Sequence, residues 1–185
     1  MEVALLLLLF IPYLVIRYYF IDHDTPAEKD RHRFRQGIEL IQDRRLDEAL
    51  AYFDGVVHQH PKSAVAYACR GKCHLKQDNY YSALYDLTHS LSLDNTLADC
   101  YLDKGIAFFY LDMFADAFRE FDKAVWHFRG QQPDALRWRA LSRIRLQQLP
   151  QAESDLKRAI GLGDENSAYL LKQPPFSRTV NTPSN

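Results

Sequence analysis

The chain has few of the residues on which small cross-linked proteins depend. Its 185 residues include three Cys, seven Gly and eight Pro. Three cysteines cannot all pair, so a disulfide framework is excluded and a reducing compartment is favoured. Cys69, Cys73 and His74 lie close in sequence, but the second Cys/His pair that a structural zinc site needs is missing. We therefore expect no metal site and interpret these residues as small packing residues.

The chain also lacks an excess of charge of either sign. There are 23 Lys and Arg against 24 Asp and Glu, which gives a net charge of −1 and a pI near 6.6. Nucleic-acid-binding domains carry a basic excess, so nucleic acid is not an expected partner. Apolar residues at 47% and charged residues at 25% are typical of one ordinary globular domain with a true core.

Motifs of catalysis are missing as well. There is no Gly-rich phosphate loop and no G-x-S-x-G sequence. His58 and His60 have no carboxylate or third ligand at metal spacing, and acidic residues such as Asp47 and Glu120 follow the pattern of solvated helix surfaces. We expect no catalytic residue and no cofactor, and an enzyme or metal-binding protein is the distant alternative.

What the sequence does contain begins with a long apolar run. Positions 3–21 are apolar except for Arg17. Coiled into a helix, this run is long enough to approach the thickness of the bilayer core. A cleaved signal peptide and a buried core helix are the alternatives. The first is disfavoured because no early basic residue and no Ala-x-Ala site is present. The second is disfavoured because the rest of the chain buries its apolar faces on itself.

We therefore predict a retained transmembrane segment over residues 1–21, followed by a linker over 22–29. No Lys or Arg precedes the run, and basic residues lie near and after its end: Arg17, Lys29, Arg31, Arg33 and Arg35. The positive-inside rule then predicts a single-pass membrane protein whose remaining residues lie on the cytoplasmic side.

The second feature is an internal repeat with a period of about 34 residues. Three columns keep this interval, and they are Gly37, Gly71 and Gly105; Ala49, Ala83 and Ala117; and Phe53, Leu87 and Phe121. In each unit, apolar residues at helical spacing predict two short amphipathic helices joined by a polar turn, such as residues 77–79. One such hairpin has too small a core to fold alone, so the units must stack.

These columns resemble the tetratricopeptide repeat (TPR), a family of helix-turn-helix units with the same period. Tyr67 and Tyr101 stand at its first aromatic position, and Pro61 at its late proline. The first unit departs from the pattern with Arg33 at the aromatic position. The resemblance implies an all-α, right-handed solenoid of about four repeats plus a short capping helix. It covers most of the chain and is specific for fold, not for function.

The predicted domain spans residues 30–172, with repeats over 30–63, 64–97, 98–131 and 133–166, a capping helix over 167–172 and a disordered tail over 173–185. The fourth repeat follows a one-residue insertion and carries Ala140 in the glycine column. Arg139 and Arg143 occupy places that are usually apolar. Either this hairpin is looser, or these side chains reach solvent at the end of the array.

In this family, the first helix of each repeat lines a concave groove that binds an extended peptide or a partner's helix. First-helix residues outside the packing columns are therefore the candidate binding residues. They are Phe34, Ile38, Ile41, Lys72, Lys76, Leu102, Ile106, Phe109, Tyr110, Arg137 and Arg145. Because this surface combines apolar and basic groups, it predicts a peptide or helix with apolar and acidic residues. The alternative is that Ile38, Ile106 and Phe109 only pack against neighbouring helices.

One subfamily of these proteins holds the C-terminal carboxylate of chaperones with Lys, Asn and Arg side chains. The matching positions here are occupied by Phe34, Ile38, Cys69, Asp99 and Asp103. The resemblance therefore does not extend to this carboxylate clamp. The sequence predicts a membrane-anchored scaffold that mediates protein–protein interaction. The alternative is the same scaffold exported to an envelope or luminal assembly.

Overall fold

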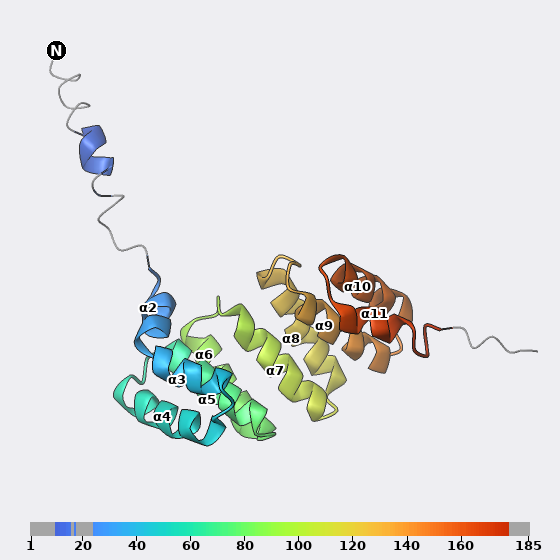
Figure 1. Cartoon of the computed structure of the whole chain (residues 1–185), viewed down its shortest axis with the longest axis horizontal. Helices are drawn as coiled ribbons and strands as arrows, with labels where there is room; N and C mark the ends of the chain where they lie inside the picture. The colour runs from blue at the N-terminus through green and yellow to red at the C-terminus, as the bar shows by residue number, and fades with distance from the viewer. Residues whose placement is uncertain (1–9, 16, 18–23, 178–185) are drawn as a thin grey trace, which may run out of the picture.

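The computed structural model describes residues 10–15, 17 and 24–177, and from residue 24 onward these form a stack of helical hairpins (Figure 1). Its helices are α2 (Pro26–Arg33), α3 (Arg35–Gln42), α4 (Leu46–Gln59), α5 (Ala64–Lys76), α6 (Tyr80–Leu93), α7 (Ala98–Tyr110), α8 (Phe114–His127), α9 (Pro133–Arg145), α10 (Leu149–Gly161) and α11 (Glu165–Leu171). The predicted all-α solenoid of four repeats and a capping helix is observed.

The turns inside the hairpins repeat with the period of the sequence. Each turn contains one non-glycine residue with φ close to +60°, two positions before the second helix begins; these residues are Arg44, Asp78, Asp112 and Gln147. The first three keep the interval of the glycine column, and the fourth comes one position later than that interval requires. The predicted one-residue insertion therefore lies between the third and fourth hairpins, where Arg129 and Gly130 also have positive φ.

The packing columns lie where the two helices of a hairpin cross. The four alanines of the second helices and the four large residues after them are all fully buried: Ala49, Ala83, Ala117, Ala152, Phe53, Leu87, Phe121 and Leu156. Opposite them, a Cβ atom on Gly105 would lie 2.5 Å from the Phe121 ring, and one on Gly37 would lie 2.4 Å from the Tyr52 ring. Glycine is required there because the second helix occupies the space of a side chain.

The first repeat has no aromatic residue at the opening position of the pattern, and a local change of backbone conformation compensates for this. Its first helix is divided into α2 and α3 at Phe34, which has φ −99° and ψ 20°. The Phe34 ring is buried and lies 5.5 Å from the His60 ring, much as the Tyr101 ring lies 4.8 Å from that of His127. Phe34 thus takes the place of the opening aromatic, and its prediction as a groove residue is wrong.

A row of buried ion pairs runs through the repeats on the residues that precede the glycine column. Arg70 donates two hydrogen bonds of 2.7 Å to Asp86 and one of 3.1 Å to Asp54 of the preceding repeat. Arg139 repeats this arrangement with Asp155 (2.9 and 2.6 Å) and Asp122 (2.7 Å). Each arginine therefore joins its own hairpin to the one before it.

Both alternatives for Arg139 and Arg143 are consequently wrong. Arg139 is 8% exposed, and the columns of its hairpin are fully buried, so the packing is not loose. Arg143 donates a 2.6 Å hydrogen bond to the same carboxylate, Asp155. The apolar places are filled by cations because a buried carboxylate on the second helix compensates their charge.

The C-terminal cap extends beyond its predicted end. Asp164 caps α11 by accepting a 2.9 Å hydrogen bond from the backbone N–H of Ser167. After α11, the N–H groups of Phe176 and Ser177 donate to the Gln173 carbonyl at 3.0 and 3.1 Å, and Phe176 packs against the core of the fourth hairpin. Residues 173–177 therefore belong to the folded array, and the rest of the predicted tail lies outside the described residues.

Only part of the predicted transmembrane segment can be compared with the structure. Residues 10–15 are helical and exposed, and most of the remaining predicted segment lies outside the described residues. Within the described part of the chain, no helix combines the length and the apolar character needed to cross a membrane. Thr25 and Glu28 form a capping box that starts α2 at Pro26, so residues 26–29 of the predicted linker are helical and the first repeat begins earlier than predicted.

The buried ion pairs make a prediction about stability. Arg70→Met leaves the Asp86 carboxylate, which is 1% exposed, without its guanidinium. We expect a loss of about 3–5 kcal/mol in the free energy of unfolding, because an uncompensated charge stays buried. The double variant Arg70→Met/Asp86→Leu should recover most of this loss. Equilibrium urea unfolding followed by circular dichroism measures all three proteins.

The control is Arg45→Met, which removes a guanidinium from an exposed pair with Glu48. This variant should unfold at the same urea concentration as the wild type. If Arg45→Met and Arg70→Met shift the midpoint equally, the buried pairs have no special role in holding the repeats together.

Candidate functional site

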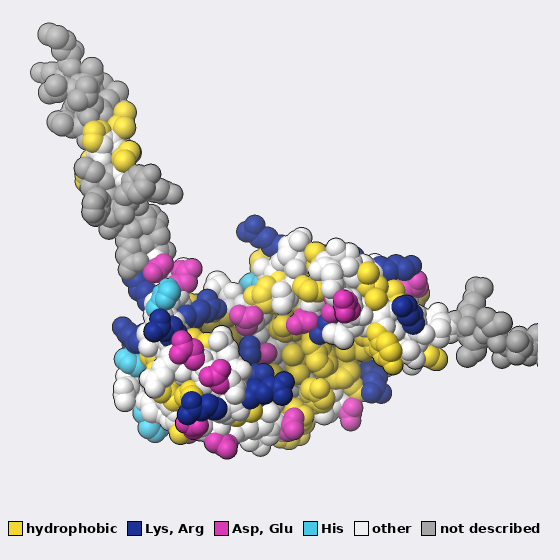
Figure 2. Space-filling model, viewed as in Figure 1, with side chains coloured by type: hydrophobic (Ala, Val, Ile, Leu, Met, Phe, Trp, Pro, Cys, Tyr) yellow, Lys and Arg dark blue, Asp and Glu magenta, His cyan; other side chains and the backbone are white. Residues whose placement is uncertain are grey.

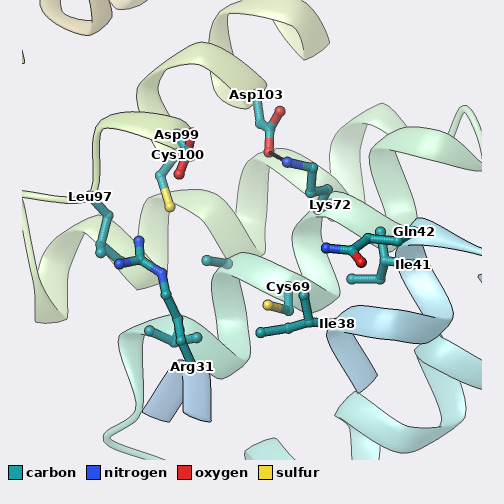
Figure 3. Close-up of a pocket in the computed structure, with 12 residues that line it drawn as sticks. Arg31, Ile38, Ile41, Gln42, Cys69, Lys72, Leu97, Asp99, Cys100 and Asp103 are labelled. Carbon is teal, nitrogen blue, oxygen red and sulfur yellow. Dashed lines mark ion pairs between the residues drawn. The ribbon is translucent and has the colours of Figure 1, made fainter. Parts of the chain in front are cut away.

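A pocket of about 220 Å³ lies on the face formed by the first helices of the first three hairpins (Figure 3). The residues that line it come from α2, α3, α5, α7 and the turn before α7. They are Arg31, Ile38, Ile41, Gln42, Val65, Ala68, Cys69, Lys72, Leu97, Asp99, Cys100 and Asp103. The second helices contribute nothing to it, so the pocket lies in the groove that the stacking of hairpins creates.

The pocket has an apolar floor and a charged wall. Ile38, Ile41 and Ala68 supply apolar surface from α3 and α5. On the α7 wall, Asp103 is 8% exposed, and its carboxylate lies 3.6 Å from Lys72 Nζ (Figure 3). The Asp103 carboxylate raises the pKa of Lys72, so this lysine is charged at neutral pH.

Two thiols also point into the pocket. Burial raises the pKa values of Cys69 and Cys100 to about 12 each. Both residues are therefore protonated at neutral pH and act as small apolar groups, since the thiolate is the nucleophilic form. The described residues contain no group of three or more His, Cys, Asp or Glu that could hold a metal ion.

Outside the pocket, aromatic side chains of α6, α7 and α9 form a cluster that we call the aromatic shelf: Tyr80, Phe109, Tyr110 and Trp138. The Tyr80 and Tyr110 rings stack with centroids 5.3 Å apart, and the Trp138 ring lies 5.4 Å from that of Phe109. Tyr110 is 55% exposed, so the shelf presents aromatic surface to solvent. Figure 2 shows apolar side chains gathered in the hollow over α7, with basic side chains beside them.

The structure divides the predicted site residues among different surroundings. Ile38, Ile41 and Lys72 line the pocket, and Phe109 and Tyr110 belong to the aromatic shelf. Lys76 is exposed at the end of α5. Arg145 lies with its guanidinium carbon 5.2 Å from the centre of the Phe114 ring.

The other predicted site residues have structural partners. Arg137 donates hydrogen bonds to both Asp134 and Asp164, so its charge is already compensated. Leu102 and Ile106 pack against the apolar core clusters, and so does Ile38, which also lines the pocket. These residues and the buried Phe34 do not form one binding surface with the pocket.

Sequence reasoning missed much of the pocket wall. Arg31, Gln42, Val65, Leu97 and Cys100 were not predicted, and neither was Trp138 on the shelf. Asp99 and Asp103 were named only as residues that depart from the carboxylate-clamp pattern. One signal could have found several of them, because the position six residues before each column glycine recurs in the pocket as Arg31, Val65 and Asp99. The position two residues before the glycine recurs as Cys69 and Asp103.

Comparisons with known proteins agree with this architecture. No family model matches the chain. MamA from Desulfovibrio magneticus RS-1 superposes with a TM-score of 0.64 at 20% identity, covering 75% of this chain and 81% of that one. The TPR domain of Arabidopsis OM64 gives 0.58 at 18% identity, with 64% and 98% covered. The chain has the fold of a tetratricopeptide-repeat solenoid.

Two further matches come from proteins with chaperone-related names. The first TPR of Spaghetti (RPAP3), solved with the HSP90 peptide SRMEEVD, superposes with a TM-score of 0.57 at 25% identity and covers 60% of this chain and 88% of that one. The Hsp70-Hsp90 organizing protein of Triticum aestivum is 25% identical over 104 residues, which are 56% of this chain. The match spans 16% of the length of that relative.

Proposed function

We propose that the chain is a scaffold that binds a peptide or helix of a partner protein in the groove of its first helices. The observation that carries the proposal is the pocket itself. It spans three consecutive repeats, has an apolar floor of Ile38, Ile41 and Ala68, and is lined by first helices and the turn before α7. Concave, mostly apolar sites with a few placed polar groups are typical of ligand binding.

The comparisons support the same proposal. A solenoid of the same fold was solved with a peptide bound, the RPAP3 domain with SRMEEVD. A protein partner therefore fits this groove.

We further propose that residues 1–21 tether this scaffold to a membrane, with the repeats on the cytoplasmic side. Support comes from the sequence: the length of the apolar run, the aromatic residues at its end and the basic residues that follow it. The repeats start at Pro26, so the groove would lie close to the bilayer surface.

The groove proposal predicts the effect of one substitution. Ile38→Glu places a carboxylate on the apolar floor and should reduce capture of specific partner proteins at least tenfold, because an unpaired charge in an apolar contact is costly. Affinity capture with the full chain, followed by quantitative mass spectrometry, measures this ratio. The matched control is Tyr81→Glu on α6, where the side chain is 76% exposed and outside the pocket.

Partners retained by wild type and Tyr81→Glu but lost by Ile38→Glu support the proposal. Equal capture by all three proteins, with unchanged circular dichroism, would show that the groove is not the binding surface.

The membrane proposal is tested separately. The full chain should remain in the membrane pellet after alkaline carbonate extraction, whereas Leu6→Asp/Leu8→Asp should be released, because two charges in the apolar run prevent stable insertion. Protease added to intact cells should leave the repeats uncut, and they should be cut once the cells are opened. Cutting in intact cells would favour the exported alternative, and release of the wild type by carbonate would contradict the anchor.

A further inference from the structure

The Asp103 carboxylate on the pocket wall has unusually weak partners for a buried charge. Its residue is 8% exposed, and among the described residues it forms one ion pair, with Lys72 at 3.6 Å, while Lys76 acts on it from beyond ion-pair distance. The buried carboxylates of Asp86 and Asp155 receive hydrogen bonds of 2.6–2.9 Å from arginine. Charge-assisted hydrogen bonds of this kind are normally about 2.7–2.9 Å long. Asp103 therefore retains acceptor capacity, and it faces the pocket.

A second carboxylate stands one helical turn away. Asp99 and Asp103 are four positions apart on α7, so their side chains lie on one face of this helix. Asp99 is exposed at the pocket mouth, and among the described residues it forms no ion pair. In Figure 3 both side chains project from the α7 wall, and Arg31 reaches toward Leu97 from the opposite side.

The cation that now faces Asp103 can leave. Lys72 holds a single ion pair, and its side chain is 41% exposed. Its flexible stem can turn to solvent, where the ammonium group is well hydrated. Burial leaves the Asp103 carboxylate poorly solvated and raises its pKa, so a closer cation would stabilise its charged form.

We propose that the groove recognises a peptide segment in which a lysine or arginine lies beside an apolar side chain. The cation binds between Asp99 and Asp103 in place of Lys72, and the apolar side chain contacts Ile38 and Ile41 on the pocket floor. This inference rests on the proposed function and adds that the partner's side chain at this site is positively charged. It differs from the acidic partner predicted from the sequence, because Lys72 and Arg137, two of the cations that suggested one, are already paired.

An acidic segment fits this wall poorly. A peptide such as SRMEEVD, named in the RPAP3 structure, would bring two glutamates and an aspartate toward Asp99 and Asp103. Like charges in a partly buried site repel, since less solvent screens them. The groove should therefore discriminate against acidic peptides as well as favour basic ones.

The test is a selection followed by a charge swap. The full chain is used to select from a phage-displayed library of random nonapeptides. One selected peptide is then synthesised in three versions, with its cationic residue kept, replaced by glutamine and replaced by glutamate. Fluorescence anisotropy measures the affinity of each version for the wild type, for Asp99→Asn/Asp103→Asn and for the control Asp112→Asn. Asp112 is an exposed residue of the turn after α7, outside the pocket.

The expected selection is enriched in lysine or arginine beside apolar residues. The cationic peptide should bind at least tenfold more weakly to Asp99→Asn/Asp103→Asn than to wild type or Asp112→Asn. The glutamine version should bind all three proteins alike, because the carboxylates then have no charge to contact. Circular dichroism of the variants verifies that they are folded.

Three results would overturn the inference. The first is a selection enriched in acidic peptides. The second is a cationic peptide whose affinity does not depend on the two carboxylates. In both cases, loss of binding in Ile38→Glu would leave the proposed function standing. The third is a library from which no peptide is retained, which would overturn the inference and the proposed function together.

Discussion

The constraint on which the structure depends is the close approach of the two helices in each hairpin. At Gly37, Gly71 and Gly105 the facing side chains lie within 3.0 Å of where a Cβ would be, so the helices touch through backbone and large second-helix residues. This contact recurs in the first three units, and Ala140 takes the glycine's place in the fourth, so that all four first helices lie on one side. The pocket follows from that geometry, because its lining comes from first helices and the turn before α7.

The buried ion pairs join adjacent hairpins of the stack. Adjacent hairpins must be joined along the row that precedes the glycines, and here the row carries Arg70, Lys104 and Arg139. Arg70 and Arg139 each hold a carboxylate of their own hairpin and one of the hairpin before. At the middle junction, Lys104 lies 3.7 Å from Glu120 of its own hairpin. Lys72 and Asp103 connect the second and third hairpins at this junction, inside the pocket.

The sequence was sufficient to predict the fold because the residues that recur at a fixed interval are those that pack between helices. Glycine, alanine and aromatic columns must recur wherever identical hairpins stack, and the turn residues with positive φ follow the same interval. The sequence was not sufficient where a residue fills a position of the repeat pattern only because the backbone changes conformation there. It was also not sufficient where a residue is buried only because a partner distant in sequence compensates its charge. Phe34 fills the aromatic place only because the helix is interrupted there, and Arg139 is buried only because Asp155 faces it.

Periodicity also limits how much of the candidate site could be predicted from the sequence. Residues outside the columns point to the groove as a surface, and Ile38, Ile41 and Lys72 among them line the pocket. Periodicity does not say which charges are already neutralised, so the acidic partner predicted from the sequence counted cations such as Lys72 and Arg137 whose pairing it could not reveal. Pairing depends on distances between helices: Arg137 meets Asp164 of the capping segment, and Lys72 meets Asp103 of the next repeat.

The most direct test is to measure which helices a bound peptide protects from hydrogen exchange. Hydrogen–deuterium exchange of the full chain, with and without a peptide selected on it, resolves α5 and α7 from α6 and α8. We expect slower exchange in α5 and α7, whose residues line the pocket, and unchanged exchange in α6 and α8. Protection confined to α6 and α8, or no protection at saturating peptide, would contradict this expectation.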